Sequence, residues 1–466
     1  MLHSQKWHCD LQIGGMLHCG ARFLHRRLLT LWSPQVPTQK SSSSKTVLET
    51  SSKKSQSSSL LNLDDGKVFR LKTKWELSRA LLVFFLCSSP WLVQKAPKLL
   101  SFTRRILGRR LWTSALRLTL YGQFVAGETH KEIKETLQRL QHLGVRPLLA
   151  VPIEEDEPKP SSERWYDKNV QSMITCLDLS VGGAPNPMMQ LKVTALMAAE
   201  LCVSTVGCIK QQLLGEVSFS CLSQEENQHF QKSLRRLNSV AEYAVEKGVR
   251  VLVDAEYTYI NPALSLVDFL FLDSPPPLCI LFIILPGNPK YDTLERLKQD
   301  VALAECLGVS FGIKLVRGAY LNKERKLAKE KGYPDPVQPS WEATNESYRR
   351  CLDFGLDQVS QVKERFEMIV ATHNEASVTH AVQRYCGEKG WGGTVFGQLL
   401  GMCDQVSLAL GQAGYAIYKS IPYGSVEEVI PYLIRRAHEN QSVLLGIRKE
   451  RDLLCLELWR RILRRP

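Results

Sequence analysis

The stretch AIYKSIPYGSVEEVIPYLIRRAHEN, residues 416–440, holds a complete strand–turn–helix unit. Its apolar start ends in polar residues, turns at Pro422–Gly424 and continues with the apolar spacing of a helix. Other short apolar runs have the same form, and a helical pattern follows each. They are RPLLAVPIEED (146–156), MMQLKVTAL (188–196), VRVLVDAE (249–256), FGIKLVRGAY (311–320), EMIVATHNE (367–375) and GTVFGQLLGM (393–402).

These runs predict seven strands, and LCILFIIL (278–285) is the best candidate for an eighth. Eight strand–helix units over about 290 residues favour a (β/α)8 barrel of the TIM type. A doubly wound sheet also alternates strands and helices. No GxGxxG loop follows any of the strands, which argues against a dinucleotide-binding sheet of that kind.

The chain divides into four predicted regions around this barrel. Residues 1–58 are polar and low in complexity, 59–143 read as an N-terminal helical region, 144–440 form the barrel, and 441–466 form a C-terminal helix. The apolar run at 80–93 is too short to span a membrane and is broken by Ser-Ser-Pro, so we expect a buried helix or one that touches a membrane.

The N-terminus has the composition of a mitochondrial transit peptide. No Asp or Glu occurs from Leu11 to Leu48, which holds five Lys/Arg residues and a serine run at 41–44. A disordered basic tail is the alternative. The C-terminal LLCLELWRRILRRP (453–466) interleaves four arginines with Leu and Trp. It fits either a helix packed on the barrel or one lying on an anionic membrane surface.

Composition limits the remaining partners. The net charge of +13 suits nucleic acid, a membrane or an anionic ligand. No Lys/Arg stripe with interleaved aromatics is present, which disfavours nucleic acid. The thirteen cysteines include no CxxC pair and no Cys/His spacing for a metal, so we expect reduced thiols and no metal site.

Polar residues at the strand ends are the candidate site, because the carboxyl ends of barrel strands meet at one mouth. The set is rich in cations, which suits an anionic ligand. It comprises Lys192, Asp254, Glu256, Lys314, Arg317, Thr372, His373, Gln398, Lys419 and Ser420, with Arg435 and Arg436 on the last helix. Each has a simpler alternative: His373 as a structural histidine, Asp254 as a helix cap, and Arg435 in a surface pair with Glu439.

Adjacent arginines can hold a carboxylate in a forked geometry that lysine cannot copy. Arg436 continues the apolar face of the last helix, where an unpaired charge is costly. A Schiff-base aldolase using Lys192 or Lys314 is a further alternative, which borohydride trapping would test.

Eight motifs in this order resemble the proline dehydrogenase family. They are YGQFVAGE (121–128), LKVTAL (191–196), VLVDAE (251–256), KLVRGAY (314–320), ATHNE (371–375), FGQLLGM (396–402), LGQAGY (410–415) and YLIRRAHEN (432–440). The resemblance implies a distorted (βα)8 barrel with non-covalent FAD, in which an imino acid loses hydride to flavin N5. It also implies ubiquinone as electron acceptor and contact with the matrix side of the mitochondrial inner membrane.

Carried over by motif, Lys192, Asp254 and Lys314 look like catalytic positions. Substrate-binding positions resemble Lys192, Ser420, Tyr432, Arg435 and Arg436, the last two as the carboxylate clamp. Flavin-contacting positions resemble Asp254, Ala255, Lys314, Val316, Arg317, Gly318, Thr372, His373 and Glu439.

Two departures from the family pattern matter. Family members that favour proline resemble Y-x-PYG, whereas this chain has KSIPYG (419–424). Ser420 in place of the tyrosine is similar to the hydroxyproline dehydrogenase branch, because it leaves room for a ring hydroxyl; some proline turnover is still expected.

The other departure is the segment 273–290, where Gly287 takes the place of a flavin-contacting glutamine. A chain with proline as main substrate, or an inactive isoform that binds no flavin, are therefore kept as alternatives.

Overall fold

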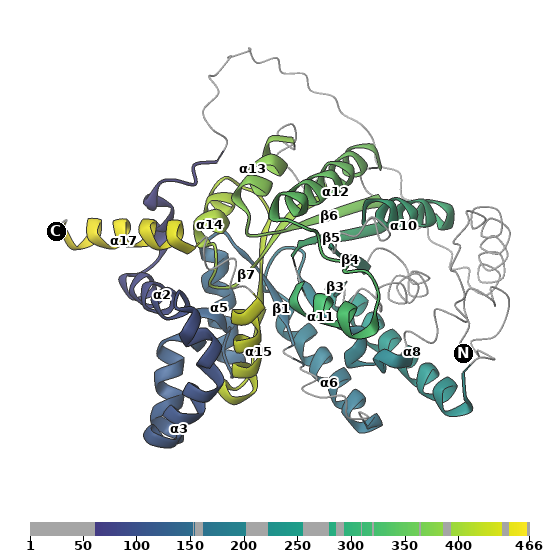
Figure 1. The fold of residues 1–466 in the computed structure, drawn as a ribbon, viewed down its shortest axis with the longest axis horizontal. Helices are drawn as coiled ribbons and strands as arrows, with labels where there is room; N and C mark the ends of the chain where they lie inside the picture. Colours follow the sequence, from purple (N-terminus) through teal and green to yellow (C-terminus); the bar gives the residue numbers. More distant parts are fainter. Residues whose placement is uncertain are drawn as a thin grey trace, which may run out of the picture.

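The protein is described here by a computed structural model that covers residues 61–151, 153, 162–201, 222–254, 279–285, 293–308, 310–318, 321–362, 365–384, 393–439 and 447–463. Eight parallel strands close into a barrel in sequence order (Figure 1). They are β1 (Arg146–Ala150), β2 (Met188–Leu191), β3 (Arg250–Val253), β4 (Cys279–Leu285), β5 (Phe311–Arg317), β6 (Phe366–Ala371), β7 (Thr394–Leu399) and β8 (Ile417–Pro422).

Every predicted strand is confirmed, including the eighth. β4 pairs in parallel with β3, where Val251 faces Cys279, and with β5, where Leu285 faces Arg317. The barrel closes where β8 pairs with β1. Within the unusual segment 273–290, the apolar residues 279–285 therefore supply a wall of the barrel.

Helices surround the strands and extend the fold at both ends. The N-terminal elements are η1 (Gly66–Leu71), α2 (Lys74–Cys87), α3 (Pro90–Leu118), α4 (Leu120–Phe124) and α5 (His130–His142). The barrel helices are α6 (Glu163–Ser180), η2 (Val193–Ala195), α8 (Gln224–Lys247), α10 (Thr293–Leu307), α11 (Leu321–Lys331), α12 (Trp341–Val362), α13 (Glu375–Arg384), α14 (Asp404–Gln412) and α15 (Val426–Glu439). The C-terminal helix is α17 (Ile447–Leu463), which packs on α2 and η1.

Alternation along the strands builds two layers inside the barrel. Leu148, Met188, Leu252, Ile369 and Tyr418 form a buried apolar cluster there. Side chains two positions further along a strand point the same way and lie nearer its carboxyl end. Gln190, Asp254 and Ser420 occupy those positions after Met188, Leu252 and Tyr418. A polar layer therefore lies above an apolar layer.

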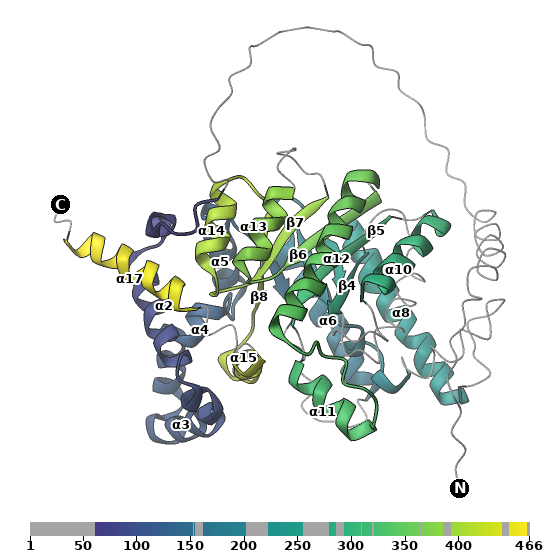
Figure 2. The same cartoon turned by 45° about the horizontal axis from the view of Figure 1, so that its top comes forward.

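The last barrel helix packs on the N-terminal helices. Val426, Val429 and Ile430 of α15 share a buried cluster with Trp112 and Leu116 of α3, and Figure 2 shows α15 between the N-terminal helices and the barrel. The connection is also polar: the Tyr121 hydroxyl donates to the Gly424 carbonyl at 2.6 Å. The position of α15 is thus set by residues about 300 positions earlier in the chain.

Glycine permits a close approach where α4 meets the barrel. Gly401 has a φ of +76°, and a Cβ there would lie 2.4 Å from the Gln123 carbonyl oxygen. Any other residue would push α4 away from the loop between β7 and α14, because both the conformation and the space require glycine.

Candidate active site

A connected chain of polar side chains crosses the inside of the barrel. The Ser420 hydroxyl on β8 donates to Gln190 on β2, with 2.5 Å between Oγ and Oε1. The Gln190 amide nitrogen donates to Oδ1 of Asp254 at 3.1 Å. The same carboxylate oxygen lies 3.6 Å from Nζ of Lys314 on β5. Three predicted site residues are thus joined, and Gln190 is the link between them.

Lys314 lies in a balance of charges. Burial lowers its pKa below the usual value, the Asp254 carboxylate raises it, and the charge of Arg436 lowers it further. Because Arg436 acts on Lys314, the arginine of α15 lies near the polar layer formed by the strands. The gathering of cations at one end of the barrel stays a prediction, and this electrostatic effect is consistent with it.

The two arginines of α15 share one aromatic neighbour. The guanidinium carbons of Arg435 and Arg436 lie 5.9 and 5.2 Å from the ring centre of Tyr432. Stacking on an aromatic ring restrains a guanidinium and leaves its N–H edge for a planar acceptor. Tyr432, Arg435 and Arg436, predicted together as substrate-binding residues, form one cluster.

Lys192 directly follows β2. Its Nζ donates to the carbonyl oxygen of Ile153 at 3.3 Å, just beyond β1. This contact holds the lysine at the carboxyl ends of β1 and β2, where the strand pattern predicted it.

The predicted flavin positions on β5 and β6 carry two buried nitrogens without a hydrogen-bond partner among the described residues. They are Nε of Arg317 and Nδ1 of His373. Arg317 also stacks on Trp341, 5.4 Å from its ring centre, and donates to Asn345 on α12. Its side chain therefore lies on the α12 side of β5, apart from the Ser420–Lys314 chain.

His373 is held neutral. Its Nε2 accepts from the Leu399 amide at 3.5 Å, so the proton resides on Nδ1. Burial and the charge of Lys419 lower the pKa of His373 to about 3. The orphan Nδ1–H is thus a buried donor at neutral pH, which costs free energy unless a bound group accepts it.

The remaining predicted flavin positions have local roles or cannot be placed. Thr372 is buried and its hydroxyl accepts from the Asn374 amide at 3.1 Å. Val316 borders the interior apolar cluster, and Gly318 adopts a φ of +72° with open space around it. Ala255, Gly287 and the side chain of Glu439 lie outside the described residues.

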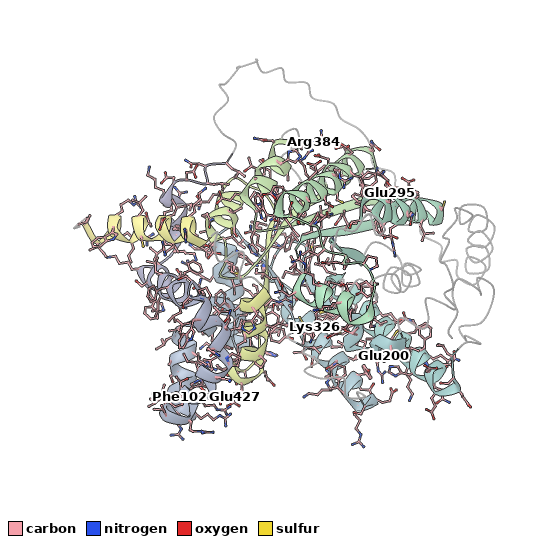
Figure 3. The ribbon with its side chains drawn as sticks, viewed as in Figure 1. Phe102, Glu200, Glu295, Lys326, Arg384 and Glu427 are labelled. Carbon is pink, nitrogen blue, oxygen red and sulfur yellow. The ribbon has the colours of Figure 1, made fainter. Side chains whose placement is uncertain are left out.

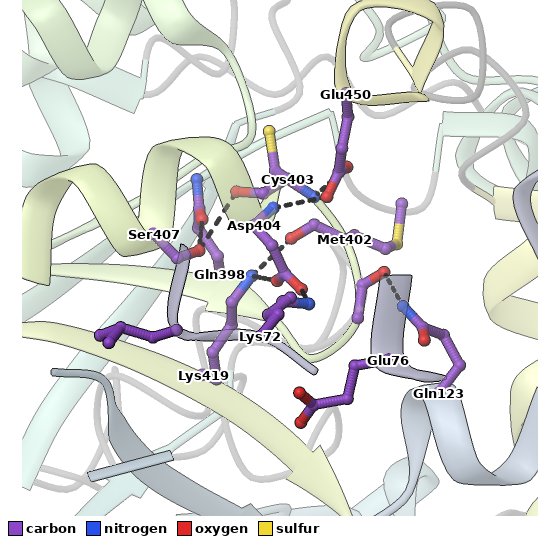
Figure 4. A network of polar contacts seen from close by, with 12 residues as sticks. Lys72, Glu76, Gln123, Gln398, Met402, Cys403, Asp404, Ser407, Lys419 and Glu450 are labelled. Atoms are coloured by element: carbon purple, nitrogen blue, oxygen red, sulfur yellow. Dashed lines mark hydrogen bonds and ion pairs between the residues drawn. The ribbon is translucent and has the colours of Figure 1, made fainter. Parts of the chain in front are cut away.

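The placement of Lys419 at the barrel mouth was wrong. Neighbouring strand residues point to opposite sides, so Ser420 faces inward and Lys419 outward. Lys419 lies 3.0 Å from Asp404 and donates to the Leu399 carbonyl at 3.0 Å (Figure 4). Lys72 pairs with the same carboxylate. Burial opposes ionisation of Asp404, but the two lysines hold its pKa well below the usual range.

This outer network also anchors the C-terminal helix. Both carboxylate oxygens of Glu450 on α17 accept backbone N–H groups, from Cys403 and Asp404, each at 2.8 Å (Figure 4). Burial and the nearby Asp404 charge raise the pKa of Glu450 to about 7. A cavity of about 430 Å³ adjoins this network, outside the barrel, lined by α2, α4, α5 and α14. Neither feature touches the polar layer.

Comparison with known proteins assigns the family. A model of the family described as proline dehydrogenase matches residues 133–449. The chain belongs to the proline dehydrogenase family. It is an oxidoreductase that acts on CH–NH bonds, as the strand-end motifs and their order predicted.

Named relatives match this family member over most of their length. Hydroxyproline dehydrogenase of Xenopus laevis is 52% identical over 435 residues, covering 87% of this chain and 91% of the relative. The human hydroxyproline dehydrogenase is 48% identical, covering 86% and 93%. Human mitochondrial proline dehydrogenase 1 is 31% identical, covering 85% and 88%.

Solved structures agree with the fold. Proline utilization A of Bdellovibrio bacteriovorus superposes with a TM-score of 0.58 at 16% identity, covering 93% of this chain and 42% of that one. The Bradyrhizobium japonicum protein gives 0.54 at 17% identity, covering 84% and 43%. The chain spans less than half the length of these proteins, and at such identity the likeness concerns the fold alone.

Proposed function

We propose that this chain oxidises trans-4-hydroxy-L-proline to the corresponding 3-hydroxy-pyrroline-5-carboxylate. The ring loses a hydride from its δ-carbon and a proton from its nitrogen, and a C=N bond forms. Bound FAD would supply the hydride acceptor at N5 and a route for the electrons to ubiquinone. The observation that carries the substrate assignment is the inward Ser420 hydroxyl, held by Gln190 in the polar layer.

The carboxylate of the substrate is assigned to Arg435 and Arg436. Both guanidinium groups are restrained by Tyr432, and paired arginines offer parallel N–H donors to a carboxylate. Such a clamp fixes the ring before reaction, so part of the entropic barrier is met by binding.

The direction of the Ser420–Gln190 hydrogen bond indicates how the ring hydroxyl of the substrate would bind. Ser420 has one hydroxyl proton and gives it to Gln190. Its oxygen can then only accept, so the substrate hydroxyl would donate to Ser420. Proline lacks this donor and would leave the serine lone pairs without a partner, which favours the hydroxylated ring modestly.

Charge supports the ionisation state that the reaction needs. The substrate nitrogen must be neutral when hydride leaves. The charge of Arg436 lowers the pKa of Lys314. The same two positive charges would disfavour a protonated substrate nitrogen beside them. Asp254 holds Lys314 in place at 3.6 Å, and Lys192 adds a positive charge at the ends of β1 and β2.

The residues present fit a flavin. Arg317 and His373 each offer a buried nitrogen that has no hydrogen-bond partner among the described residues, and the FAD acceptors could satisfy both. Lys314, Asp254, Val316, Gly318 and Thr372 would border the same group. Ala255 and Glu439 stay on the proposed list by motif alone.

We also propose the mitochondrion as compartment, with the protein on the matrix side of the inner membrane. The acid-free, Ser-rich N-terminus supports this, as does the mitochondrial name of a relative. Proline as main substrate is the second candidate, favoured by that 31% identical relative. The isoform without flavin loses its main support, because β4 pairs on both edges.

A flavin spectrum tests the proposal. The purified chain should be yellow, and anaerobic hydroxyproline should bleach it, while an Arg435→Ala/Arg436→Ala variant should stay yellow. Comparing kcat/KM for hydroxyproline and proline decides between the two substrates. A folded, flavin-loaded protein that hydroxyproline never bleaches would refute the proposal. A folded protein that takes up no FAD would support the inactive isoform instead.

A further inference from the structure

Exposed apolar side chains concentrate on the N-terminal helices. Of the eighteen large hydrophobic residues that are exposed in the described part of the chain, ten lie between Trp75 and Leu118. Phe102 is 62% exposed and Ile106 66% exposed, and Figure 3 shows Phe102 on α3, away from the barrel strands. An apolar surface of this extent on a folded protein usually marks a contact with another body.

The apolar residues of α3 form one face. Trp91, Leu99, Phe102 and Ile106 are exposed and follow one another at spacings of eight, three and four residues. Such spacings keep side chains on one side of a helix. The opposite side carries Val93, which is buried, and Leu100, which packs on the cluster shared with α15. The exposed face therefore takes no part in the packing of the described fold.

Positive charge surrounds this face without negative charge. From residue 77 to residue 127 the chain has eight Lys/Arg residues and no Asp or Glu. Lys95, Lys98, Arg105 and Arg110 form no ion pair with any described residue. Arg104 and Arg109 pair with Glu427 of α15, and Arg117 pairs with Glu128 and Glu132 near the start of α5. The face is complementary to an apolar surface with anionic groups at its edge.

Charge disfavours two alternatives that could cover this apolar face. Residues 1–60 carry eight Lys/Arg against two acids, so they would be repelled from a cationic face. A second copy of this face would bring two cationic surfaces together, with the same penalty. No single described helix is long and apolar enough to cross a bilayer, although α2 and α3 meet that test jointly with a bend of 97°.

We propose that the outer face of α2 and α3 docks on the surface of an anionic lipid bilayer. Trp75, Trp91 and Phe102 enter the interfacial region, where aromatic rings are favoured. The free lysines and arginines contact anionic headgroups, each strengthening binding about five-fold. Leu456, Trp459 and Ile462 are exposed on α17, which packs on α2. This inference deepens the proposed membrane contact, but its test needs no turnover and is independent of the substrate.

Vesicle flotation with the full chain tests it. Vesicles of equimolar phosphatidylcholine and phosphatidylglycerol should carry the protein, and pure phosphatidylcholine vesicles should carry much less. Phe102→Ser/Ile106→Ser should weaken binding at least about 10-fold. Lys98→Glu/Arg105→Glu should weaken it about 30-fold, and added salt should have the same effect on the unaltered chain.

The matched control removes exposed apolar side chains elsewhere. Val181→Ser/Val245→Ser alters residues 47% and 41% exposed beside α6 and on α8, and it should bind as the unaltered chain does. Circular dichroism and Tm confirm that each variant is folded. Unchanged binding of the Phe102/Ile106 variant overturns the proposal, because the cationic residues 1–60 would then account for adhesion. A dimer in sedimentation that this variant dissociates would also overturn it.

Discussion

Replacing Gln190 by leucine should reduce the preference for hydroxyproline over proline. Gln190 accepts a hydrogen bond from the Ser420 hydroxyl at 2.5 Å and donates one to Asp254 at 3.1 Å. Leucine keeps the volume and removes both contacts. The Ser420 hydroxyl can then rotate and need no longer present its lone pairs to the substrate.

The geometry sets the size of the effect. One oriented neutral hydrogen bond to the substrate hydroxyl is worth about 1–1.5 kcal/mol. The ratio of kcat/KM values for the two substrates should therefore fall roughly 5–10-fold. Asp254 also loses a hydrogen bond to its carboxylate, worth about 1.5–3 kcal/mol. Turnover of both substrates should fall as Lys314 loses a fixed partner.

Gln398→Leu is the matched control, because Gln398, which the strand pattern also placed at the barrel mouth, bonds instead to Ser407 of α14 outside the polar layer. Gln398 on β7 makes the same two kinds of contact at the same lengths, donating to the Thr372 carbonyl at 3.1 Å and accepting from Ser407 at 2.5 Å. Its loss should lower the free energy of unfolding by about 1–2 kcal/mol, because a buried carbonyl and hydroxyl lose a partner. Its substrate ratio should not change.

Steady-state kinetics with both substrates gives the ratios, and urea unfolding gives the stabilities. The reasoning is refuted if Gln190→Leu keeps the ratio of the unaltered chain while its unfolding free energy falls. Gln190 would then be a structural link only. An equal change of ratio in Gln398→Leu would refute it in a different way, since a general loosening of the barrel would explain both.

Three other changes have defined outcomes. Ser420→Tyr should shift the kcat/KM ratio toward proline, because the ring refills the space and removes the acceptor; an unchanged ratio would contradict the role of Ser420. Arg436→Lys should raise KM roughly 10–100-fold, since a forked contact of about 1.5–3 kcal/mol becomes a point charge, whereas an unchanged KM would place the carboxylate elsewhere. His373 has a folded pKa of about 3 against 6.5 when unfolded, so below pH 6.5 only the unfolded chain takes up its proton. Without flavin, the unfolding free energy should fall by about 1.4 kcal/mol per pH unit from this group once the pH is below about 5.5, and His373→Gln should remove that share between pH 5.5 and 4.5.

The strands were predictable because each is an apolar run that ends in polar residues. Even β4 was found, although its surroundings depart from the family pattern. A parallel strand between two neighbours needs mainly apolar side chains and free backbone groups, and Cys279–Leu285 supplies both.

Charge marked most of the cluster that the structure brings together, and Ser420 stood out by its departure from the family pattern. Asp254, Lys314 and the arginine pair are charged residues at strand or helix positions where charge is costly. Gln190 was missed because one amide inside MMQLKVTAL carries no charge and no motif. The alternation of side chains along a strand could have revealed it. Gln190 lies two positions after the buried Met188 and therefore points, like Met188, into the barrel. The same rule, applied to Lys419 and Ser420, would have separated them.

The packing of α15 on α3 has a consequence for synthesis. Trp112 and Leu116 are covered in part by Val426 and Val429, which follow about 300 residues later. At roughly 5–20 residues per second, the ribosome leaves these side chains uncovered for roughly 15–60 s. Nascent α3 then exposes apolar residues on both sides at once. The chain is therefore most prone to aggregate during translation, before its last tenth has emerged, and chaperone capture should be greatest in that interval.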